Sequence, residues 1–434
     1  MLRALSLLSS GHRRDHRHHC ARVVGMSTNR QVVVLDNGGY TCKAGIGGQD
    51  QPLRVLPNCA VKPKRERRFF LADQIDDILD LSQVIYKRPC ERGYTTNWDI
   101  QCEIWDRVYK HVLKINPSES DLLVSEPVCN LRSLSRSMDE IVFEKYQFQN
   151  YARLPAPSMA LYYANSALAN KGGAGMLSET YSVVVDVGYS FSHVVPFMEE
   201  APINHAIKRV SVGGKLLTNY LKEVISYRAF SMMDETHLIN HVKEKVCFTS
   251  TDFQVDLVKA KLSKKKNPYR LEYVLPTHVD GKTLGYIKTE DSKTTDDDQI
   301  LTLSNERITV PELLFSPSMI GIKQGGIAEA ITQSVKACHP DIQALLYKNI
   351  VLIGGSTKFP NFQKRLRQDL RAQVPSDWEI NIRSAGSGVD PSLCAWKGGS
   401  MMVKSGAYSN YSLSKKTYEE YGPDACKRKF YWYA

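Results

Sequence analysis

The stretch VVVLDNGGYTCKAGIGG, from Val32 to Gly48, decides the fold. It begins as a β-branched apolar run, reaches Asp36, breaks into a pair of glycines and continues as an apolar return from Lys43 to Ile46. An apolar strand, a tight turn and a return strand predict a β-hairpin whose turn directly follows the aspartate. Glycines at such a turn let backbone N–H groups approach phosphate oxygens closely, so the stretch also predicts a phosphate-binding loop.

The chain repeats this pattern in a second stretch, VVVDVGYSFS, from Val183 to Ser192. Both copies share an all-apolar strand, an aspartate, a glycine and a tyrosine, and both continue into a return strand. Asp36 and Asp186 lie 150 residues apart, which is about the length of one domain. Two such hairpins predict duplicated α/β domains that face each other across a cleft. A chance match is the alternative, because apolar strands followed by glycine are common.

A third glycine turn and a lysine complete the candidate site. The stretch NIVLIGGSTKFPNF, from Asn349 to Phe362, again runs a β-branched strand into paired glycines, Gly354 and Gly355. Aspartates on two opposed hairpins would lie near the phosphates of a nucleotide, where a carboxylate pair suits Mg²⁺ held through water. Lys43 can reach the same phosphates as a point charge. The alternatives are turn-forming aspartates that bond their own backbone and an ordinary surface lysine.

Length and charge add broad limits. The chain has 434 residues, more than a single core usually supports, so two domains or lobes are expected. No apolar run approaches the length that crosses a bilayer. The net charge is +11, and a basic balance is compatible with an anionic partner such as nucleic acid. The 10 cysteines are scattered without zinc-binding spacing, which favours free thiols in a reducing compartment.

The first 25 residues differ in composition from the rest of the chain. They carry five arginines against Asp15 and are rich in serine and histidine, which is the composition of a transit peptide. Met26 follows directly, so an upstream start codon or a disordered tail explains the segment at least as well. We therefore treat residues 1–29 as an N-terminal extension outside the core fold and draw no localisation from them.

Segments between the turns have recognisable periodicities. Residues 216–225 and 237–247 place apolar side chains at helical spacing, and both stripes are expected in the core. Lys243 and Glu244, beside the second stripe, either lie on a solvated face or border the cleft. Residues 277–298 are polar, mixed in charge and poor in aliphatic side chains, and predict an inserted loop.

A series of motifs runs along the chain in a definite order. They are LDNGGYTCKAG (Leu35–Gly45), TNWD (Thr96–Asp99), the hairpin at Asp186, GGKLLTNYL (Gly213–Leu221), VKEKVCF (Val242–Phe248), SNERITVPELLFSPSMIGI (Ser304–Ile322), IGGSTKFP (Ile353–Pro360) and AWKGGS (Ala395–Ser400). In this order they resemble the actin family from about Gln31 to Phe430. The resemblance implies two similar α/β lobes around a nucleotide cleft, the fold shared with sugar kinases and Hsp70-type ATPases. It places the first lobe at residues 30–170 plus about 370–434, and the second lobe, with the insertion, at 171–369.

The resemblance also implies which residues bind a nucleotide. The matching positions belong to the two phosphate hairpins, the surroundings of adenosine and the third turn. In that order they are Asp36, Gly38, Lys43, Asp186 and Gly188; Gly214, Lys243 and Glu244; and Gly354 and Gly355. The implied cofactors are ATP or ADP with Mg²⁺, which Asp36 and Asp186 would hold through water.

Both phosphate hairpins depart from the actin pattern. The first has Gly39 and Tyr40 where actin carries Ser-Gly, so a hydroxyl donor is lost and a large ring is gained. In the second, Tyr189 and Ser190 stand at positions of an aspartate and a glycine.

Further departures bear on hydrolysis. The histidine that helps to order the attacking water in actin is kept as His193, but the glutamine that positions this water falls on Ala156. A methyl group cannot orient a nucleophile. The lysine that actin places near the base also falls in a region that has Ser392. We therefore expect tight nucleotide binding with little or no turnover, and no catalytic residue.

The sequence also departs from the actin pattern in the segment that actin uses for filament assembly. Actin's mobile loop docks onto the next subunit of the filament, but here only RERRF remains between KPK (Lys62–Lys64) and FLADQ (Phe70–Gln74). Losing that apolar tip argues against a homopolymer. The insertion at 277–298 stands where actin has a short connection, and we expect both segments to contact partners.

Together with EKYQFQ, VGYSFSH, VGGKLLTNYLKE and ISYR, these departures resemble the actin-related protein six family. Its members are nuclear subunits of the Swr-type chromatin remodelling complex, which exchanges standard for variant histone. The resemblance implies a non-motor subunit that is not an enzyme, located in the nucleus, with the cytoplasm also allowed. Its implied partners are the remodeller ATPase subunit, a zinc-finger HIT-domain subunit and, through the complex, the histones of the nucleosome; neither a membrane nor a homopolymer is expected.

Three alternatives stay open. An active ATPase or sugar kinase of the same fold requires a catalytic group at the water position. A cytoskeletal actin-like protein requires polymerisation. Direct DNA binding would use the basic runs KPKRERR (Lys62–Arg68) and SKKKNPYR (Ser263–Arg270), which otherwise are solvated surface, a nuclear-import signal or a contact to an acidic partner.

Overall fold

The computed structural model describes residues 30–64, 66–78, 84–169, 180–263, 266–276, 284–292, 295, 298–386 and 388–430. Residues from Gln31 onward form one structural unit. The predicted extension over residues 1–29 lies outside the described residues, and so does half of the predicted insertion at 277–298. The described part of this insertion is not only loop, because it contains β16 (Tyr286–Ile287), which pairs antiparallel with β15 (Leu271–Val274). In the described part of the chain, no helix has both the length and the apolar character needed to cross a membrane.

The first sheet is built around the hairpin predicted at its start. β1 (Val32–Asn37) and β2 (Thr41–Ile46) pair antiparallel. β1 also lies parallel to β9 (Asp121–Glu126), which in turn lies parallel to β10 (Asn150–Pro155). The strand order is β20-β10-β9-β1-β2-β3, where β3 is Arg54–Pro57 and β20 is Leu413–Ser414. The middle strands are rich in Val and Leu and are buried, as is usual for parallel strands that are covered on both faces.

The second sheet repeats this arrangement. β11 (Tyr181–Val187) and β12 (Ser192–Met198) form the second predicted hairpin, and β11 lies parallel to β18 (Ile350–Ile353). β18 is followed in the sheet by β19 (Ile382–Ser384), and the order is β13-β12-β11-β18-β19. Here β13 is Ala201–Pro202, and β14 (Lys208–Val210) also pairs with β12. Each sheet therefore has a central strand that pairs antiparallel with its hairpin partner and parallel with a later strand. This repeated pairing confirms duplicated α/β lobes.

The predicted end of the second lobe near residue 370 is too early. Ile350 of β18 pairs with Ile382 of β19, so the second sheet extends to Ser384. Two parallel neighbours need a crossover connection, and α10 (Phe362–Arg371) belongs to it. A boundary near 370 would separate this crossover helix from the strand to which it leads.

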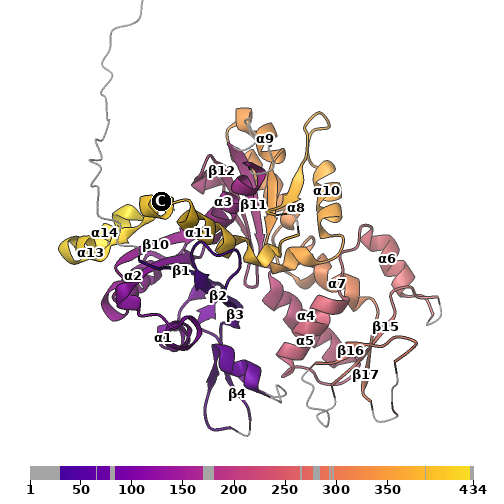
Figure 1. Cartoon of the computed structure of the whole chain (residues 1–434). Helices are drawn as coiled ribbons and strands as arrows, with labels where there is room; N and C mark the ends of the chain where they lie inside the picture. The colour runs from indigo at the N-terminus through magenta and orange to yellow at the C-terminus, as the bar shows by residue number, and fades with distance from the viewer. Residues whose placement is uncertain are drawn as a thin grey trace, which may run out of the picture. The chain divides into compact units, whose positions relative to one another are not determined.

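Two helices lie side by side between the sheets, α3 (Ala156–Ala169) and α11 (Cys394–Lys404) (Figure 1). α3 follows β10 of the first sheet, yet its Leu161 packs with core residues of the second sheet. Conversely, Trp396 of α11 packs in the core of the first sheet and donates its indole N–H to the Val34 carbonyl oxygen at 2.9 Å. The pair therefore joins the two lobes through their cores.

The predicted amphipathic helices are confirmed as α4 (Gly214–Arg228), which is longer at both ends than predicted, and α5 (Thr236–Val246), which begins and ends one residue earlier than predicted. The other helices are α1 (Trp98–Arg107), α2 (Arg132–Glu140), α6 (Phe253–Ala260), α7 (Glu306–Glu312), α8 (Ile327–Lys336), α9 (Pro340–Tyr347), α12 (Tyr408–Tyr411), α13 (Lys415–Tyr421) and α14 (Pro423–Lys429). The other strands are β3 (Arg54–Pro57), β4 (Ala60–Lys62), β5 (Phe70–Leu71), β6 (Ile85–Lys87), β7 (Cys90–Glu91), β8 (Tyr94–Thr95), β13 (Ala201–Pro202), β14 (Lys208–Val210), β15 (Leu271–Val274), β16 (Tyr286–Ile287), β17 (Ile300–Leu303) and β20 (Leu413–Ser414).

Candidate functional site

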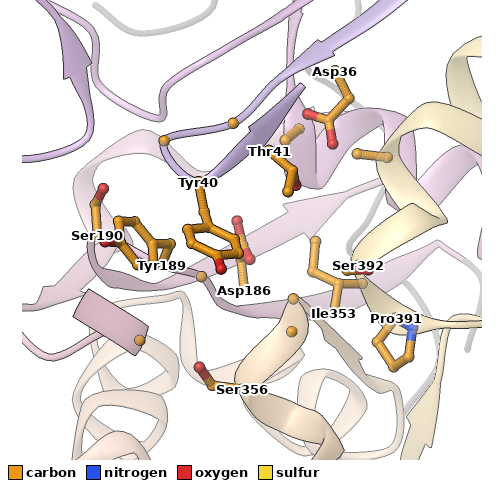
Figure 2. A pocket seen from close by; sticks show the side chains of 18 of the residues that line it. Asp36, Tyr40, Thr41, Asp186, Tyr189, Ser190, Ile353, Ser356, Pro391 and Ser392 are labelled. Atoms are coloured by element: carbon orange, nitrogen blue, oxygen red, sulfur yellow. The ribbon is translucent and has the colours of Figure 1, made fainter. Parts of the chain in front are cut away.

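One cavity collects the residues that the sequence singled out. Its volume is about 640 Å³, and its walls come from the β1–β2 hairpin, the β11–β12 hairpin, the turn after β18 and the helices α4 and α5 (Figure 2). Every predicted site residue lines it: Asp36, Gly38, Lys43, Asp186, Gly188, Gly214, Lys243, Glu244, Gly354 and Gly355. The structure therefore brings together groups that lie more than 300 residues apart in the sequence.

The first hairpin holds a buried ion pair at one wall of this cavity. Because Asp36 and Lys43 are register partners in β1 and β2, the Lys43 Nζ lies 3.0 Å from Asp36 Oδ2. Ser125 of β9 donates its hydroxyl to Asp36 Oδ1 at 2.7 Å. Burial alone would lower the pKa of Lys43, but the adjacent Asp36 carboxylate outweighs it and raises the pKa. Lys43 is thus a buried cation rather than an ordinary surface residue, and the Asp36 carboxylate bonds to partners on β2 and β9, beyond its own turn.

The second hairpin carries groups whose protonation is set by burial. Burial, together with the nearby Asp36 carboxylate, raises the pKa of Asp186 to about 6, although Lys43 opposes the shift. His193 stands opposite Asp186 in the register of β11 and β12. Burial, with Arg209 adding to it, lowers the pKa of His193 to about 4, so this imidazole is neutral at pH 7. The cavity thus holds an acidic group and a neutral histidine on neighbouring strands.

Two of the glycines fit their turns because a side chain would not. A Cβ at Gly38 would lie 2.9 Å from the Thr41 carbonyl oxygen. Gly354 has a φ of +90°, and a Cβ there would also collide with the backbone of Val187. Next to it, a Cβ on Gly355 would meet no heavy atom within 4 Å, so this backbone opens onto free space. The third turn therefore leaves room for a ligand to approach the main chain.

The α5 end of the cavity is polar and tightly bonded. Lys243 donates through Nζ to the carbonyl oxygen of Gly214 at 3.2 Å, to Thr218 Oγ1 at 2.9 Å and to Asn240 Oδ1 at 2.8 Å. Asn240 donates in turn to Glu244 Oε1 at 2.8 Å. Burial lowers the pKa of Lys243 to about 8, with Glu244 opposing the shift. Of the two readings left open by the sequence, the structure favours residues that border the cleft, although the Lys243 ammonium is bonded to protein acceptors.

Tyr40 and Tyr189 line the cavity, and together with Arg88 they form a group that was not foreseen. The Tyr40 and Tyr189 rings lie with their centroids 4.8 Å apart and their planes at 33°, and Figure 2 shows them together in the cavity. The Arg88 guanidinium lies 5.0 Å from the Tyr40 ring centroid and 5.1 Å from that of Tyr189. The sequence showed large rings at two glycine-loop positions, and this was the only signal of the contact; nothing pointed to Arg88.

The predicted water position has no polar side chain. Ala156 is the first residue of α3 and lines the cavity, and its methyl group has neither a donor nor an acceptor. His193 lines the same cavity. Of the two groups that order water in the actin pattern, one is therefore in place and the other is replaced by a methyl group.

The donor set fits a nucleotide with Mg²⁺ at the phosphate end. Mg²⁺ usually takes one or two protein carboxylates besides phosphate oxygens and water, and Asp36 and Asp186 supply that number. Lys43 adds a cation, and the open backbone at Gly355 adds free space. In the described part of the chain, no group of three or more Asp, Glu, His or Cys side chains could hold a metal ion without such a ligand.

The two lobes share one strand order, and each contributes an aspartate-bearing hairpin to the cavity between them. This arrangement defines the actin-type class of α/β proteins. The family model described as Actin matches residues 27–431 of this chain. Similar relatives include actin-related protein 6 of Oryza sativa subsp. japonica, 38% identical over 437 residues that cover 94% of this chain and 100% of the relative. The relative of the same name in Dictyostelium discoideum is 35% identical and covers 94% and 96%, and that of Drosophila melanogaster is 38% identical and covers 90% and 97%. The chain belongs to the actin family, in its actin-related protein 6 group.

Proposed function

We propose that this protein is a non-motor subunit of a Swr-type chromatin remodelling complex, in which it supports variant histone exchange. Its proposed direct partners are the remodeller ATPase subunit and a zinc-finger HIT-domain subunit, and it engages the nucleosome through the complex. The proposal rests on membership in the actin-related protein 6 group. It places the protein in the nucleus, as a part of a larger assembly and not as an enzyme.

The observation that carries the non-enzymatic part of the proposal is the methyl group of Ala156 at the predicted water position. Members of the actin family normally bind a nucleotide with a divalent cation. The bound nucleotide and Mg²⁺ would supply an anionic ligand that contacts both lobes at once. Lys43 would neutralise phosphate charge, and Asp36 and Asp186 would hold the cation through water. With neither a donor nor an acceptor at Ala156, the attacking water stays unoriented and hydrolysis is slow.

The proposal also includes a chain that does not polymerise. β4 and β5 are joined by residues 63–69 only, of which Arg65 lies outside the described residues. The connection is mostly charged, and cations cover the aromatic rings at its end: the Lys62 Nζ lies 5.9 Å from the Phe69 ring centroid, and the Arg68 guanidinium lies 4.5 Å from that of Phe70. A connection of this length and charge lacks an apolar tip that could dock onto another subunit.

The membership proposal is tested by purifying the tagged chain from its own cells under mild salt. We expect the remodeller ATPase subunit and the zinc-finger HIT-domain subunit to co-purify in amounts comparable to the chain. A second preparation, which lacks residues 277–298, should lose part of these partners if the insertion contacts them. Recovery of the full-length chain without either partner would overturn the assignment to the complex.

The competing function is an active ATPase of the same fold, which the retained Asp36, Lys43 and His193 favour. It differs from the proposal in a single quantity, the rate of phosphate release.

A further inference from the structure

We infer that Tyr40, Tyr189 and Arg88 form an aromatic bridge across the cavity, which a nucleotide must part in order to enter or leave. The bridge links the two lobes through side chains of the chain itself. It therefore sets the rate of nucleotide exchange and holds the lobes together when no nucleotide is bound. The first consequence rests on the proposed nucleotide-binding function, whereas the second does not depend on it.

The two tyrosines come from opposed turns. Tyr40 stands in the turn between β1 and β2, and Tyr189 stands in the turn between β11 and β12. Ring centroids 4.8 Å apart lie in the range in which aromatic pairs attract beyond their apolar contact. The contact spans 149 residues and joins the first sheet to the second. In a site built from glycine turns, these rings take space that short side chains would leave free.

Arg88 and Asn240 hold the Tyr40 ring from two sides. Arg88 follows β6, and its guanidinium lies 5.0 Å and 5.1 Å from the two ring centroids, within the distance at which a cation is attracted to an aromatic face. It also donates to the Tyr40 carbonyl oxygen at 3.5 Å. At the other end of the ring, Asn240 of α5 donates to the Tyr40 hydroxyl at 3.1 Å. Tyr40 therefore contacts the second lobe through its ring and through its hydroxyl.

A second set of contacts lies next to the bridge. A Cβ on Gly39 would be 2.8 Å from Ser190 Oγ, so the two turns touch at this point. Arg209 of β14 donates to the Tyr94 hydroxyl at 3.2 Å, and its guanidinium lies 4.6 Å from the Phe191 ring centroid. The Gly39–Ser190 approach and the Arg209–Tyr94 bond again join the first lobe to the second, whereas the Arg209–Phe191 contact lies within the second lobe. The two lobes are therefore in contact at several neighbouring points and not only through the Tyr40 and Tyr189 rings.

The placement of Asn240 gives the bridge its connection to the ligand end of the site. Asn240 contacts Tyr40, Lys243 and Glu244 at once. Lys243 and Glu244 are the positions matched to adenosine, so movement of the Tyr40 ring is coupled to this end through one amide. A ligand that takes up Lys243 or Glu244 competes with the bonds that hold the bridge.

The exchange arm of the test uses fluorescent ADP bound to the purified full chain in the presence of Mg²⁺. Its dissociation rate is measured for the wild type, Tyr40→Gly, Tyr189→Ser and the milder Tyr40→Phe, which keeps the ring and loses the Asn240 bond. We expect release about tenfold faster or more for the first two, since stacking and cation–π contacts are both removed, and a smaller change for the third. Tyr421→Ser is the matched control, because Tyr421 is exposed and pairs with Arg428 away from the cavity. Unchanged rates in Tyr40→Gly and Tyr189→Ser would overturn the gating role.

The second arm does not depend on nucleotide. Small-angle X-ray scattering of protein treated with apyrase and EDTA compares the radius of gyration of the wild type with that of the same variants. The bridge predicts that Tyr40→Gly and Tyr189→Ser have a larger radius of gyration than the wild type. The radius of Tyr421→Ser should equal that of the wild type. If the wild type takes up no fluorescent ADP but the variants do, the bridge is supported and the proposed nucleotide function of the native chain fails. Equal scattering of wild type and variants would overturn the bridge whatever the binding result.

Discussion

At the level of single residues, the proposed binding without turnover depends on Ala156 and His193. Both line the cavity, and the neutral His193 ring can order water. Ala156 takes the position of the glutamine in the actin pattern, but its methyl group can neither donate nor accept a hydrogen bond. Because hydrolysis needs an oriented nucleophile, we propose that this methyl group separates nucleotide binding from turnover.

The protonation of His193 leads to a prediction about acid stability. Its pKa is about 4 in the folded chain, against an ordinary value of 6.5, so folding excludes the proton. The free energy of unfolding should therefore fall as the pH drops from 6.5 towards 4, by about 2–3 kcal/mol in total. His193→Gln removes this contribution. Thermal unfolding of both proteins at several pH values checks it: the difference between them should change over this window, and a constant difference would contradict the assigned pKa.

Arg153 is a buried charge that pairs with two buried carboxylates, one of which, Glu126, also lines the cavity. Its Nη1 lies 2.7 Å from Glu126 Oε2 and its Nε lies 2.9 Å from Asp139 Oδ1, and all three side chains are buried. Burial raises the pKa of Asp139 to about 6 even though Arg153 opposes the shift. The arginine therefore compensates two buried carboxylates.

We predict that Arg153→Met lowers the free energy of unfolding by about 3–5 kcal/mol, because two buried carboxylates lose their partner. Arg136→Ala on α2 is the control, since Arg136 pairs with Glu140 at the surface and should change little. Urea unfolding followed by circular dichroism measures both. Equal changes in the free energy of unfolding would show that the buried ion pairs stabilise the fold no more than the surface pair does.

At the scale of elements, the sequence predicted what local pattern determines. The hairpins at Val32–Ile46 and at Val183–Val195 follow from apolar strands that meet glycine turns, and both are present. The helices α4 and α5 follow from apolar spacing. The end of the second lobe could not be predicted from a local pattern. β19 is three residues long, and only its pairing with β18 shows to which sheet it belongs.

The predicted site residues also line one cavity, because the motif order assigns each of them to a hairpin, a turn or a helix of the actin pattern. The contacts between the two hairpin turns could not be predicted from the sequence. Tyr40 and Tyr189 are 149 residues apart, and Arg88 follows a short strand of a separate sheet. Their meeting depends on how the two lobes close, which no local periodicity encodes. The binding roles of the site residues themselves stay predictions.

The contact between α3 and α11 yields a prediction at the element scale. Gly398 faces α3 so closely that an added Cβ would collide with the Met159 carbonyl oxygen, which belongs to the backbone and cannot turn away. We expect Gly398→Ala to push the helices apart and to destabilise the chain by at least about 1–3 kcal/mol, the usual cost of overpacking. Lys404→Ala, on the exposed side of the same helix, is the control. Calorimetry should show a lower Tm for Gly398→Ala only; equal Tm values would contradict the close approach.

At the scale of the whole molecule, the chain is expected to stay monomeric when it is alone. The β4–β5 connection is short and basic, and this does not suit docking onto a second copy. In a sedimentation assay with salt, Mg²⁺ and ATP, the protein should stay in the supernatant at concentrations at which actin pellets. Sedimentation of the protein, with filaments visible in electron micrographs of the pellet, would favour the cytoskeletal alternative.

The central claim is that the two lobes hold a nucleotide without consuming it. The most direct test measures bound nucleotide and phosphate release on one preparation of the purified chain, beside Ala156→Gln. We predict about one nucleotide per chain, wild-type phosphate release no faster than the protein-free blank, and measurable release from Ala156→Gln if the glutamine alone restores an oriented water. Steady phosphate release by the wild type, in proportion to protein concentration, would contradict the account.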